Sequence, residues 1–310
     1  MADRDALRIA RAMLGFLFEP GDHQLGQLLA THGTVDTYDL LAAAEVSFTP
    51  RRELAALTAG QMWDAATAAV ETAAGGGRIV IPDDADWPLG LDDAGEWAPA
   101  CVWVCGPGWI PQPQQSVTVV GARACTAYGE HVATDLASGL ADEGRIVVTS
   151  NGFGLDRAVL RAALAVEGHP VAVVPCGLDR LRSDDQARLA DQLTSAGLLM
   201  TGFPPGAEMT RARAELNRLY LAVLTAGTVV VEAPLHGPAV AVAGEALRHG
   251  RAVMAVPGPV TSATSKGCHR LLRDHREVRP VTSVEEILTD LRGAFTPVWK
   301  RPEVDDAGPA

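Results

Sequence analysis

A buried strand, a glycine and an arginine follow one another near the middle of the chain. The β-branched run 116–120 stops at Gly121, and Arg123 comes two residues later, before a helical pattern begins. A parallel strand delivers such a loop to the carboxyl edge of an α/β sheet, where ligands bind and the N–H groups of the next helix point. A guanidinium offers a rigid fork of donors that suits phosphate oxygens. The segment therefore predicts a site for an anionic ligand.

Three further loops have a similar composition, at residues 149–156, 232–239 and 257–267. Each loop connects a strand pattern to a helix pattern, so a parallel sheet would gather all four at one edge. Glycines let a ligand approach the backbone, and Ser and Thr side chains supply hydrogen-bond donors. Gly and Pro are common in the loops of any α/β fold, so each loop taken alone is more simply interpreted as an ordinary connection. Four loops together with Arg123 and Lys266 favour a binding site.

Familiar catalytic and nucleotide-binding motifs are missing from the sequence. The first turn lacks Gly-x-Gly-x-x-Gly, and the chain has no phosphate loop, no His-Glu-x-x-His pair and no Gly-x-Ser-x-Gly elbow. Cys268 and His269 are neighbours, and neighbours on a helix point about 100° apart, so they do not form a nucleophile and its base. Asp156 stands just before a helix, where an acid more often caps. We expect no catalytic residue, no metal site and no bound cofactor.

The hydrophobic pattern divides the chain into three parts. Residues 1–75 show only helical periodicity and predict a small N-terminal all-helical domain that ends at a glycine triplet. Residues 76–295 alternate short apolar strands with helices, which predicts an α/β fold with an extended Rossmann-like parallel sheet flanked by helices. Residues 296–310 are rich in Pro and charged residues and predict a disordered tail. The predicted strands are 79–81 and 102–104 at the edge, then 116–120, 145–149, 171–174, 198–201, 228–231 and 252–256.

Composition limits the class of protein. No apolar run approaches the roughly 18–20 residues of a membrane helix, and no secretory signal is visible, so we expect no membrane partner. Five cysteines without a Cys-x-x-Cys pair indicate a reducing, cytoplasmic location. A formal net charge of −12 argues against binding nucleic acid by bulk charge alone. Between Thr201 and Arg279, however, basic residues outnumber acids by ten to six, which leaves room for a local basic site.

Several ordered segments resemble the DNA-processing protein A (DprA, or Smf) family. The similar segments are 119–123 with Tyr128-Gly129, 176–179, 203–206, Asn217-Arg218, 230–233, 255–262 and 265–272. The run 9–33 also looks like the helical domain of actinobacterial members, a SAM- or HhH-like domain. The resemblance implies an extended Rossmann-like domain that binds single-stranded DNA, forms a homodimer, helps to load a RecA-type recombinase in recombination and natural transformation, and is not an enzyme.

The chain departs from the family pattern at several positions, which marks it as a divergent member. Phe153 stands where the family usually has an arginine, and Leu216 stands where Arg-Asn-Arg begins. Residues 237–239 read Gly-Pro-Ala in place of Ser-Gly-Ser, which removes two hydroxyls and one N–H. Residues 274–276 read Asp-His-Arg in place of Asp-Gly-Ala, and no room is left after residue 295 for a winged-helix domain. These changes reduce the number of groups that could bind phosphate.

We therefore predict a site for single-stranded DNA. Arg123 binds a phosphate, Phe153 is a candidate for base stacking, and the other groups surround or extend the contact. The predicted site residues are Gly121, Arg123, Phe153, Gly154, Asn217, Arg218, Gly237, Lys266 and Arg270. One alternative is an enzyme resembling the lysine-decarboxylase-like nucleotide phosphoribohydrolases, although their Pro-Gly-Gly-x-Gly-Thr-x-x-Glu motif is missing. Another alternative is a nucleotide-binding module without DNA activity.

Overall fold

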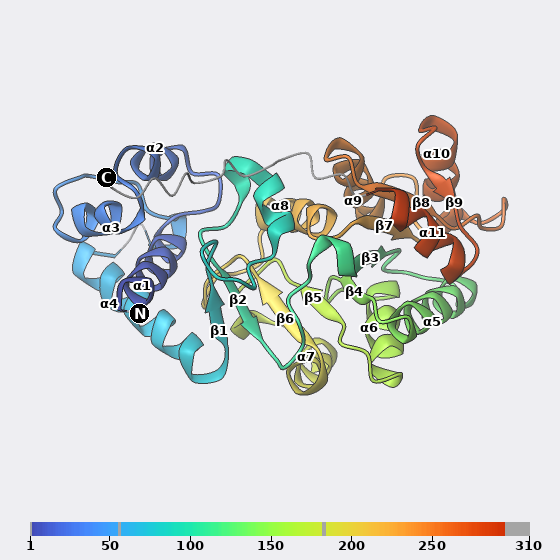
Figure 1. Ribbon diagram of the computed structural model, residues 1–310, viewed down its shortest axis with the longest axis horizontal. Helices are drawn as coiled ribbons and strands as arrows, with labels where there is room; N and C mark the ends of the chain where they lie inside the picture. The colour runs from blue at the N-terminus through green and yellow to red at the C-terminus, as the bar shows by residue number, and fades with distance from the viewer. Residues whose placement is uncertain (1, 55–56, 182–183, 295–310) are drawn as a thin grey trace, which may run out of the picture.

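The computed structural model describes residues 2–54, 57–181 and 184–294. Within them the strands form one nine-stranded sheet in the order β1-β2-β6-β5-β4-β3-β7-β8-β9 (Figure 1). Strands β3 to β9 pair in parallel. Strand β2 pairs antiparallel with β6 on one side and with the edge strand β1 on the other. The strands are β1 (Arg78–Val80), β2 (Val102–Cys105), β3 (Ser116–Val120), β4 (Ile146–Thr149), β5 (Val171–Val173), β6 (Leu198–Thr201), β7 (Gly227–Val230), β8 (Ala252–Ala255) and β9 (Arg279–Pro280).

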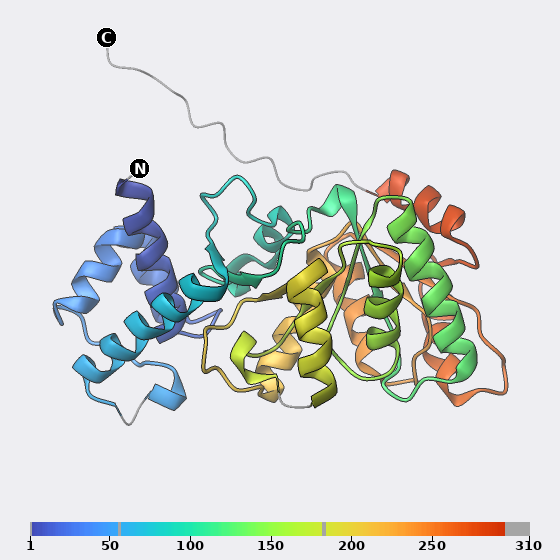
Figure 2. The same cartoon turned by 90° about the horizontal axis from the view of Figure 1, so that it is seen from below.

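Helices cover both faces of this sheet. Helices α5, α6, α7 and α11 pack on one face, and α8, α9 and α10 pack on the other. Figure 2 shows α5, α6 and α7, coloured green to yellow, in front of the sheet. The helices are α5 (Ala127–Asp142), α6 (Leu155–Ala165), α7 (Asp184–Ala196), α8 (Arg211–Val223), α9 (Pro238–Arg248), α10 (Lys266–Asp274) and α11 (Val284–Ala294).

Two-sided burial explains why the central strands are apolar throughout. Successive side chains of a strand point to opposite faces. In β4, for example, Val147 packs beneath α5 and α6, while Val148 packs beneath α8 and α9. Thr118 in β3 is also buried, and its hydroxyl donates to the Leu221 carbonyl oxygen at 2.7 Å. The predicted α/β fold is therefore confirmed. Strand β9 was not predicted, because its two exposed residues carry no apolar pattern.

Residues before β1 fold into helices, as the sequence predicts. These are α1 (Ala2–Leu17), α2 (His23–His32), α3 (Thr34–Ala42) and α4 (Ala59–Gly76), and they lie beyond the β1 edge of the sheet (Figure 1). Their own core includes Leu14, Leu17, Phe18 and Leu41. Asp22 caps α2 by accepting from the Leu25 amide at 2.9 Å. The division into domains at residue 75 stays a prediction, and the predicted tail 296–310 lies outside the described residues.

In the ranges that the structure describes, no helix is long and apolar enough to cross a bilayer.

Candidate nucleic-acid interface

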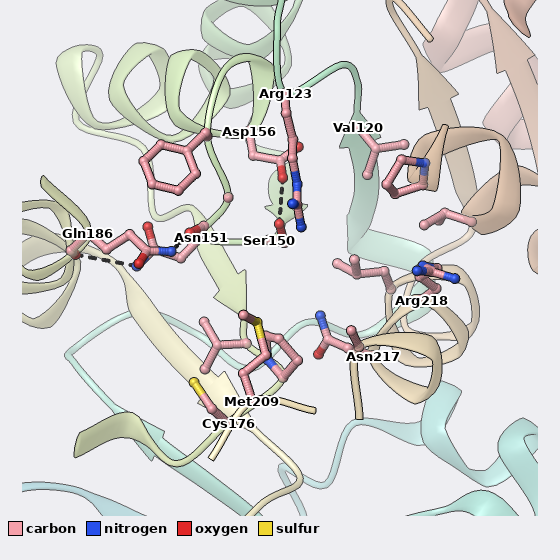
Figure 3. Close-up of a pocket in the computed structure, with 18 of the residues that line it drawn as sticks. Val120, Arg123, Ser150, Asn151, Asp156, Cys176, Gln186, Met209, Asn217 and Arg218 are labelled. Carbon is pink, nitrogen blue, oxygen red and sulfur yellow. Dashed lines mark hydrogen bonds between the residues drawn. The ribbon is translucent and has the colours of Figure 1, made fainter. Parts of the chain in front are cut away.

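The order of strands in the sheet reverses at β3. The chain passes from β3 to β4 on one side of it and later returns to β7 on its other side. A cavity of about 350 Å³ opens beside this point, at the carboxyl ends of β3, β4 and β5 (Figure 3). Helix α8 and the first turn of α9 form its other wall. Ligands of open α/β sheets bind at such reversals of strand order. The loops after β3, β4, β7 and β8 lie at one edge of the sheet, as the sequence predicts, and the cavity at this edge is completed by helices from distant segments.

Arg123 and Gly121 lie in the loop between β3 and α5, and both line the cavity. The Arg123 side chain is exposed, and no ion pair or hydrogen bond holds its guanidinium within the described part of the chain. A Cβ at Gly121 would overlap the Leu155 side chain. Gly154 has a φ of +71°, and a Cβ there would overlap the Arg123 carbonyl oxygen. The two glycines therefore let the loops after β3 and β4 pack directly against each other beside Arg123.

A carboxyl group lies next to this arginine. Asp156, in the first turn of α6, accepts a short hydrogen bond from the Ser150 hydroxyl, and both residues line the cavity (Figure 3). Burial raises the pKa of Asp156 to about 6, although the hydrogen bond from Ser150 and the charge of Arg123 oppose the shift. Asp156 therefore changes charge close to neutral pH, directly beside the predicted phosphate ligand.

Helix α8 brings Asn217 and Arg218 to the cavity. Arg218 is half-buried, and within the described residues no carboxylate pairs with it. Asn217 is only 4% exposed, and its Nδ2 donates to the Val173 carbonyl oxygen at 3.0 Å. Its Oδ1 has no partner among the described residues, which leaves a buried acceptor at the cavity wall. Arg218 is thus available to an anion, whereas Asn217 fixes the end of β5 and offers an acceptor.

Most of the lining residues were not predicted from the sequence, and Asn151, Gln186 and Met209 are among them. Asn151 is 4% exposed, and two hydrogen bonds join it to Gln186 of α7. The Asn151 Nδ2 donates to the backbone oxygen of Gln186 at 3.3 Å, and the Gln186 Nε2 donates to the backbone oxygen of Asn151 at 2.8 Å. Met209, just before α8, lies 54% exposed at the same cavity. Amides and methionines at loop positions carry no distinctive spacing, so only the fold shows that they meet here.

Phe153 also lies at the cavity, with 45% of its surface exposed. The guanidinium carbon of Arg157 lies 5.1 Å from its ring centroid. One ring face is therefore covered by a cation, and enough of the ring remains exposed to contact a ligand.

Gly237, Lys266 and Arg270 are not among the residues that line the cavity. The Gly237 amide donates to the Pro234 carbonyl oxygen at 2.9 Å, so this N–H is used within its own turn. Lys266 and Arg270 are exposed on α10, and Arg270 pairs with Asp274 at 3.2 Å. Gly237 ends the loop from β7 to α9, whose first turn lines the cavity. Of the predicted residues, five line the cavity: Gly121, Arg123, Phe153, Asn217 and Arg218. Gly154 and Gly237 lie in loops outside its lining, and Lys266 and Arg270 lie on α10.

The geometry of Cys268 and His269 agrees with packing roles. Burial raises the pKa of the Cys268 thiol to about 12, and His269 Nε2 donates to the Gly258 carbonyl oxygen at 3.0 Å. A protonated, buried thiol is a poor nucleophile. In the described ranges, no group of three or more His, Cys, Asp or Glu side chains is placed to hold a metal ion. Three arginines line the cavity, together with buried acceptors and apolar walls. Arg180 pairs with Asp179 at 3.1 Å and with Glu208 at 3.6 Å, so Arg123 and Arg218 are the two that form no ion pair in the described ranges. This lining suits an anionic, partly apolar ligand.

Comparisons with known proteins point to one family. The family model for DNA recombination-mediator protein A matches residues 78–292. A putative DNA processing protein DprA from Mycobacterium tuberculosis is 38% identical over 292 residues, covering 90% of this chain and 74% of that protein. Protein Smf of Escherichia coli is 33% identical over 177 residues, covering 57% of this chain and 47% of that protein.

Solved structures show the same fold. The structure of DprA from Streptococcus pneumoniae superposes with a TM-score of 0.71 at 22% identity, covering 92% of this chain and 97% of that one. DprA from Helicobacter pylori, whose structure is described for its single-stranded DNA binding mode, gives a TM-score of 0.61 at 16% identity, covering 71% and 98%. Since the family model matches more than half of the sequence, the chain belongs to the DNA recombination-mediator protein A family.

Proposed function

We propose that this protein binds single-stranded DNA at the cavity beside β3. The observation that carries the proposal is the pair Arg123 and Arg218, which come from different elements to one largely apolar cavity and form no ion pair in the described ranges. A guanidinium contacts a phosphate oxygen through charge-assisted hydrogen bonds. The apolar walls suit the base or sugar that each phosphate carries. Family membership and the printed title of the Helicobacter pylori structure support the same choice of ligand.

The two kinds of contact differ in what they contribute. Phosphate contacts make the affinity depend on salt, with a slope of log affinity against log salt near −0.7 per neutralised phosphate on single strands. Stacking of a base on an aromatic ring contributes about 1–3 kcal/mol. Phe153 is the aromatic ring that lines the cavity. We therefore assign the salt dependence to Arg123 and Arg218 and a sequence-tolerant stacking contact to Phe153.

Replacement of the loop arginine tests the proposal. Arg123→Ala should weaken binding of labelled oligo-dT by about tenfold or more, because a hydrogen bond to a charged group contributes about 1.5–3 kcal/mol. The salt slope should become shallower by about 0.7. Fluorescence anisotropy titrations at several salt concentrations measure both quantities. Arg161→Ala, an exposed arginine later in α6, is the matched control. Equal affinities of wild type and Arg123→Ala at moderate salt would remove Arg123 from the site.

We propose further that the protein acts in DNA processing as a binding protein rather than as an enzyme. It would protect single strands, help to load a RecA-type recombinase and work as a homodimer, and family membership supports these roles. Nuclease protection and recombinase filament assembly on coated strands test the first two, and sedimentation tests the third. Release of free base from nucleoside monophosphates would instead identify the phosphoribohydrolase alternative.

A further inference from the structure

Helix α10 presents a basic face that the cavity does not use. Lys266, Arg273 and Arg276 are all exposed on this helix and the turn after it. No carboxylate pairs with any of the three in the ranges that the structure describes, whereas Arg270 is held by Asp274 and Arg279 lies 3.7 Å from Asp290. We call Lys266, Arg273 and Arg276 the α10 basic face. On a protein with a formal net charge of −12, such a face is a local exception.

The α10 basic face is joined directly to the cavity wall. The Gly267 amide donates to the Ala233 carbonyl oxygen at 2.8 Å, and the Ala233 amide donates to the Thr264 carbonyl oxygen. The chain then runs from Ala233 through Gly237 into α9, whose first turn lines the cavity. Helix α10 also packs against α9 and β8 (Figure 1). The start of α10 is therefore one short loop away from the cavity.

A buried carboxylate ties the Arg123 loop to the same region. Glu232 accepts hydrogen bonds from the Thr126 amide at 3.0 Å, the Thr126 hydroxyl at 2.8 Å and the Thr264 hydroxyl at 2.9 Å. Thr126 follows Arg123 by three residues, and Thr264 precedes Lys266 by two. The loop that carries Arg123 and the loop that leads into α10 are thus fixed to one side chain.

An exposed aromatic ring lies across this junction. Tyr128, in the first turn of α5, is 38% exposed, and its hydroxyl donates to the Pro257 carbonyl oxygen at 3.0 Å. Pro257 begins the loop from β8 to α10. The ring is therefore held between the loop of Arg123 and the loop that leads to the α10 basic face. Its fixed, partly exposed face is the kind of surface on which an unstacked base packs.

We propose that a DNA strand held at the cavity continues across Tyr128 and along the α10 basic face. This inference rests on the proposed function and extends it, because it adds a second contact region and a direction for the strand. The α10 basic face would neutralise phosphates, and Tyr128 would stack a base between the two regions. A duplex does not suit this path, since its bases are already stacked and present no free face to Tyr128.

Binding of short and long strands tests the path. On the proposed path, oligo-dT of 4 nucleotides should occupy the cavity alone, whereas oligo-dT of 20 nucleotides should also reach the α10 basic face. The double variant Arg273→Gln/Arg276→Gln should lower the affinity for the long strand by about tenfold at low salt, since each exposed ion pair contributes modestly. The salt slope for the long strand should become shallower by about 1.4, for two phosphates. The ratio of long-strand to short-strand affinity should fall accordingly.

Substitutions at Tyr128 test the path independently. Tyr128→Leu should lower long-strand affinity by about tenfold through lost stacking, and Tyr128→Phe, which keeps the ring, should restore it. The control variant Arg4→Gln/Arg52→Gln removes two exposed arginines from the N-terminal helical region and should change neither affinity. Circular dichroism verifies that each variant is folded.

The possible failures can be told apart. Wild type that binds neither oligonucleotide contradicts the proposed function itself. Wild type that binds both, with the Arg273/Arg276 variant unchanged on the long strand, overturns only the inferred path. Equal losses on 4 and 20 nucleotides also overturn it, because the α10 basic face would then act on the cavity rather than on the strand beyond. If a 20-base-pair duplex competes as well as the single strand, the α10 basic face binds duplex DNA and the inferred single-strand path is wrong.

Discussion

At the residue scale, the most consequential pair is Arg123 and Asp156. The sequence predicts the arginine as a phosphate ligand, and the fold adds a carboxyl group whose charge opposes an incoming phosphate. Desolvation raises the pKa of Asp156 to about 6, so the group is mostly ionised at pH 7.5 and mostly protonated at pH 5. Strand binding should therefore strengthen as the pH falls through about 6, because the local negative charge disappears.

Replacement of Asp156 by asparagine tests both affinity and stability. The folded-state pKa lies above the ordinary carboxyl value of 3.8, so the folded protein holds the proton more tightly and stability falls as the pH rises from about 4 to about 6. Asp156→Asn should raise the free energy of unfolding at pH 7.5 by about 1–3 kcal/mol and flatten this pH dependence. It should also strengthen oligo-dT binding at pH 7.5. Urea unfolding and anisotropy at pH 5 and 7.5 measure these effects.

The exposed carboxylate Asp191 on α7 offers the control Asp191→Asn, which should leave both pH profiles unchanged. A less stable Asp156→Asn protein at pH 7.5 would show that the hydrogen bonds to the ionised group outweigh its desolvation.

At the element scale, the loops after β3, β7 and β8 are held by Glu232. This side chain is 1% exposed and accepts from two threonines on two other loops. Gly129 makes the arrangement possible, because a Cβ there would overlap the Glu232 carboxylate. A buried charge requires full hydrogen bonding, and threonine hydroxyls and a helix N-terminal amide supply it here. The sequence marks Glu232 only as a residue after a strand, and its partners come from segments more than thirty residues away on either side.

The prediction at this scale concerns Glu232→Gln. An amide has one acceptor oxygen in place of two, so at least one buried donor among Thr126 and Thr264 loses its partner. We expect the free energy of unfolding to fall by about 1–3 kcal/mol, with a weaker affinity for oligo-dT because the Arg123 loop loosens. Urea unfolding and anisotropy measure the two changes. Glu245→Gln, in a surface pair with Arg248, is the control and should cost less than about 1 kcal/mol. If Glu232→Gln changes neither the free energy of unfolding nor the affinity, the loops keep their positions without the Glu232 hydrogen bonds.

At the scale of the whole molecule, one ion cluster joins the N-terminal helices to the sheet. Glu19 accepts from Arg213 of α8, at 3.1 Å from Nε, and lies 3.5 Å from Nε of Arg51. The two arginine side chains are 3% and 4% exposed, while Glu19 is 39% exposed. Arg213 stands one turn before Asn217 and Arg218 on the same helix. The N-terminal helices therefore help to fix the helix that forms one wall of the cavity.

Glu19→Gln should weaken this junction. A broken buried ion pair costs about 3–5 kcal/mol, and the exposure of Glu19 to water should reduce the loss to about 1–3 kcal/mol. Thermal unfolding measures the stability, and limited proteolysis between α4 and β1 reports whether the helices detach. Glu45→Gln, at an exposed position, is the matched control. Unchanged proteolysis and stability would show that apolar contacts alone hold the two parts together.

The sequence by itself determined the alternation of strands and helices, the apolar centre of the sheet and the edge where Arg123 lies. These features follow from local hydrophobic periodicity and from the glycine after β3, which act over a few residues. Only the tertiary structure decided which groups meet. It placed Asp156 beside Arg123, turned Asn217 inward against β5 and set Lys266 and Arg270 apart from the cavity. Such pairings depend on the order of strands in the sheet and on packing between distant segments, and no local pattern in the chain encodes them.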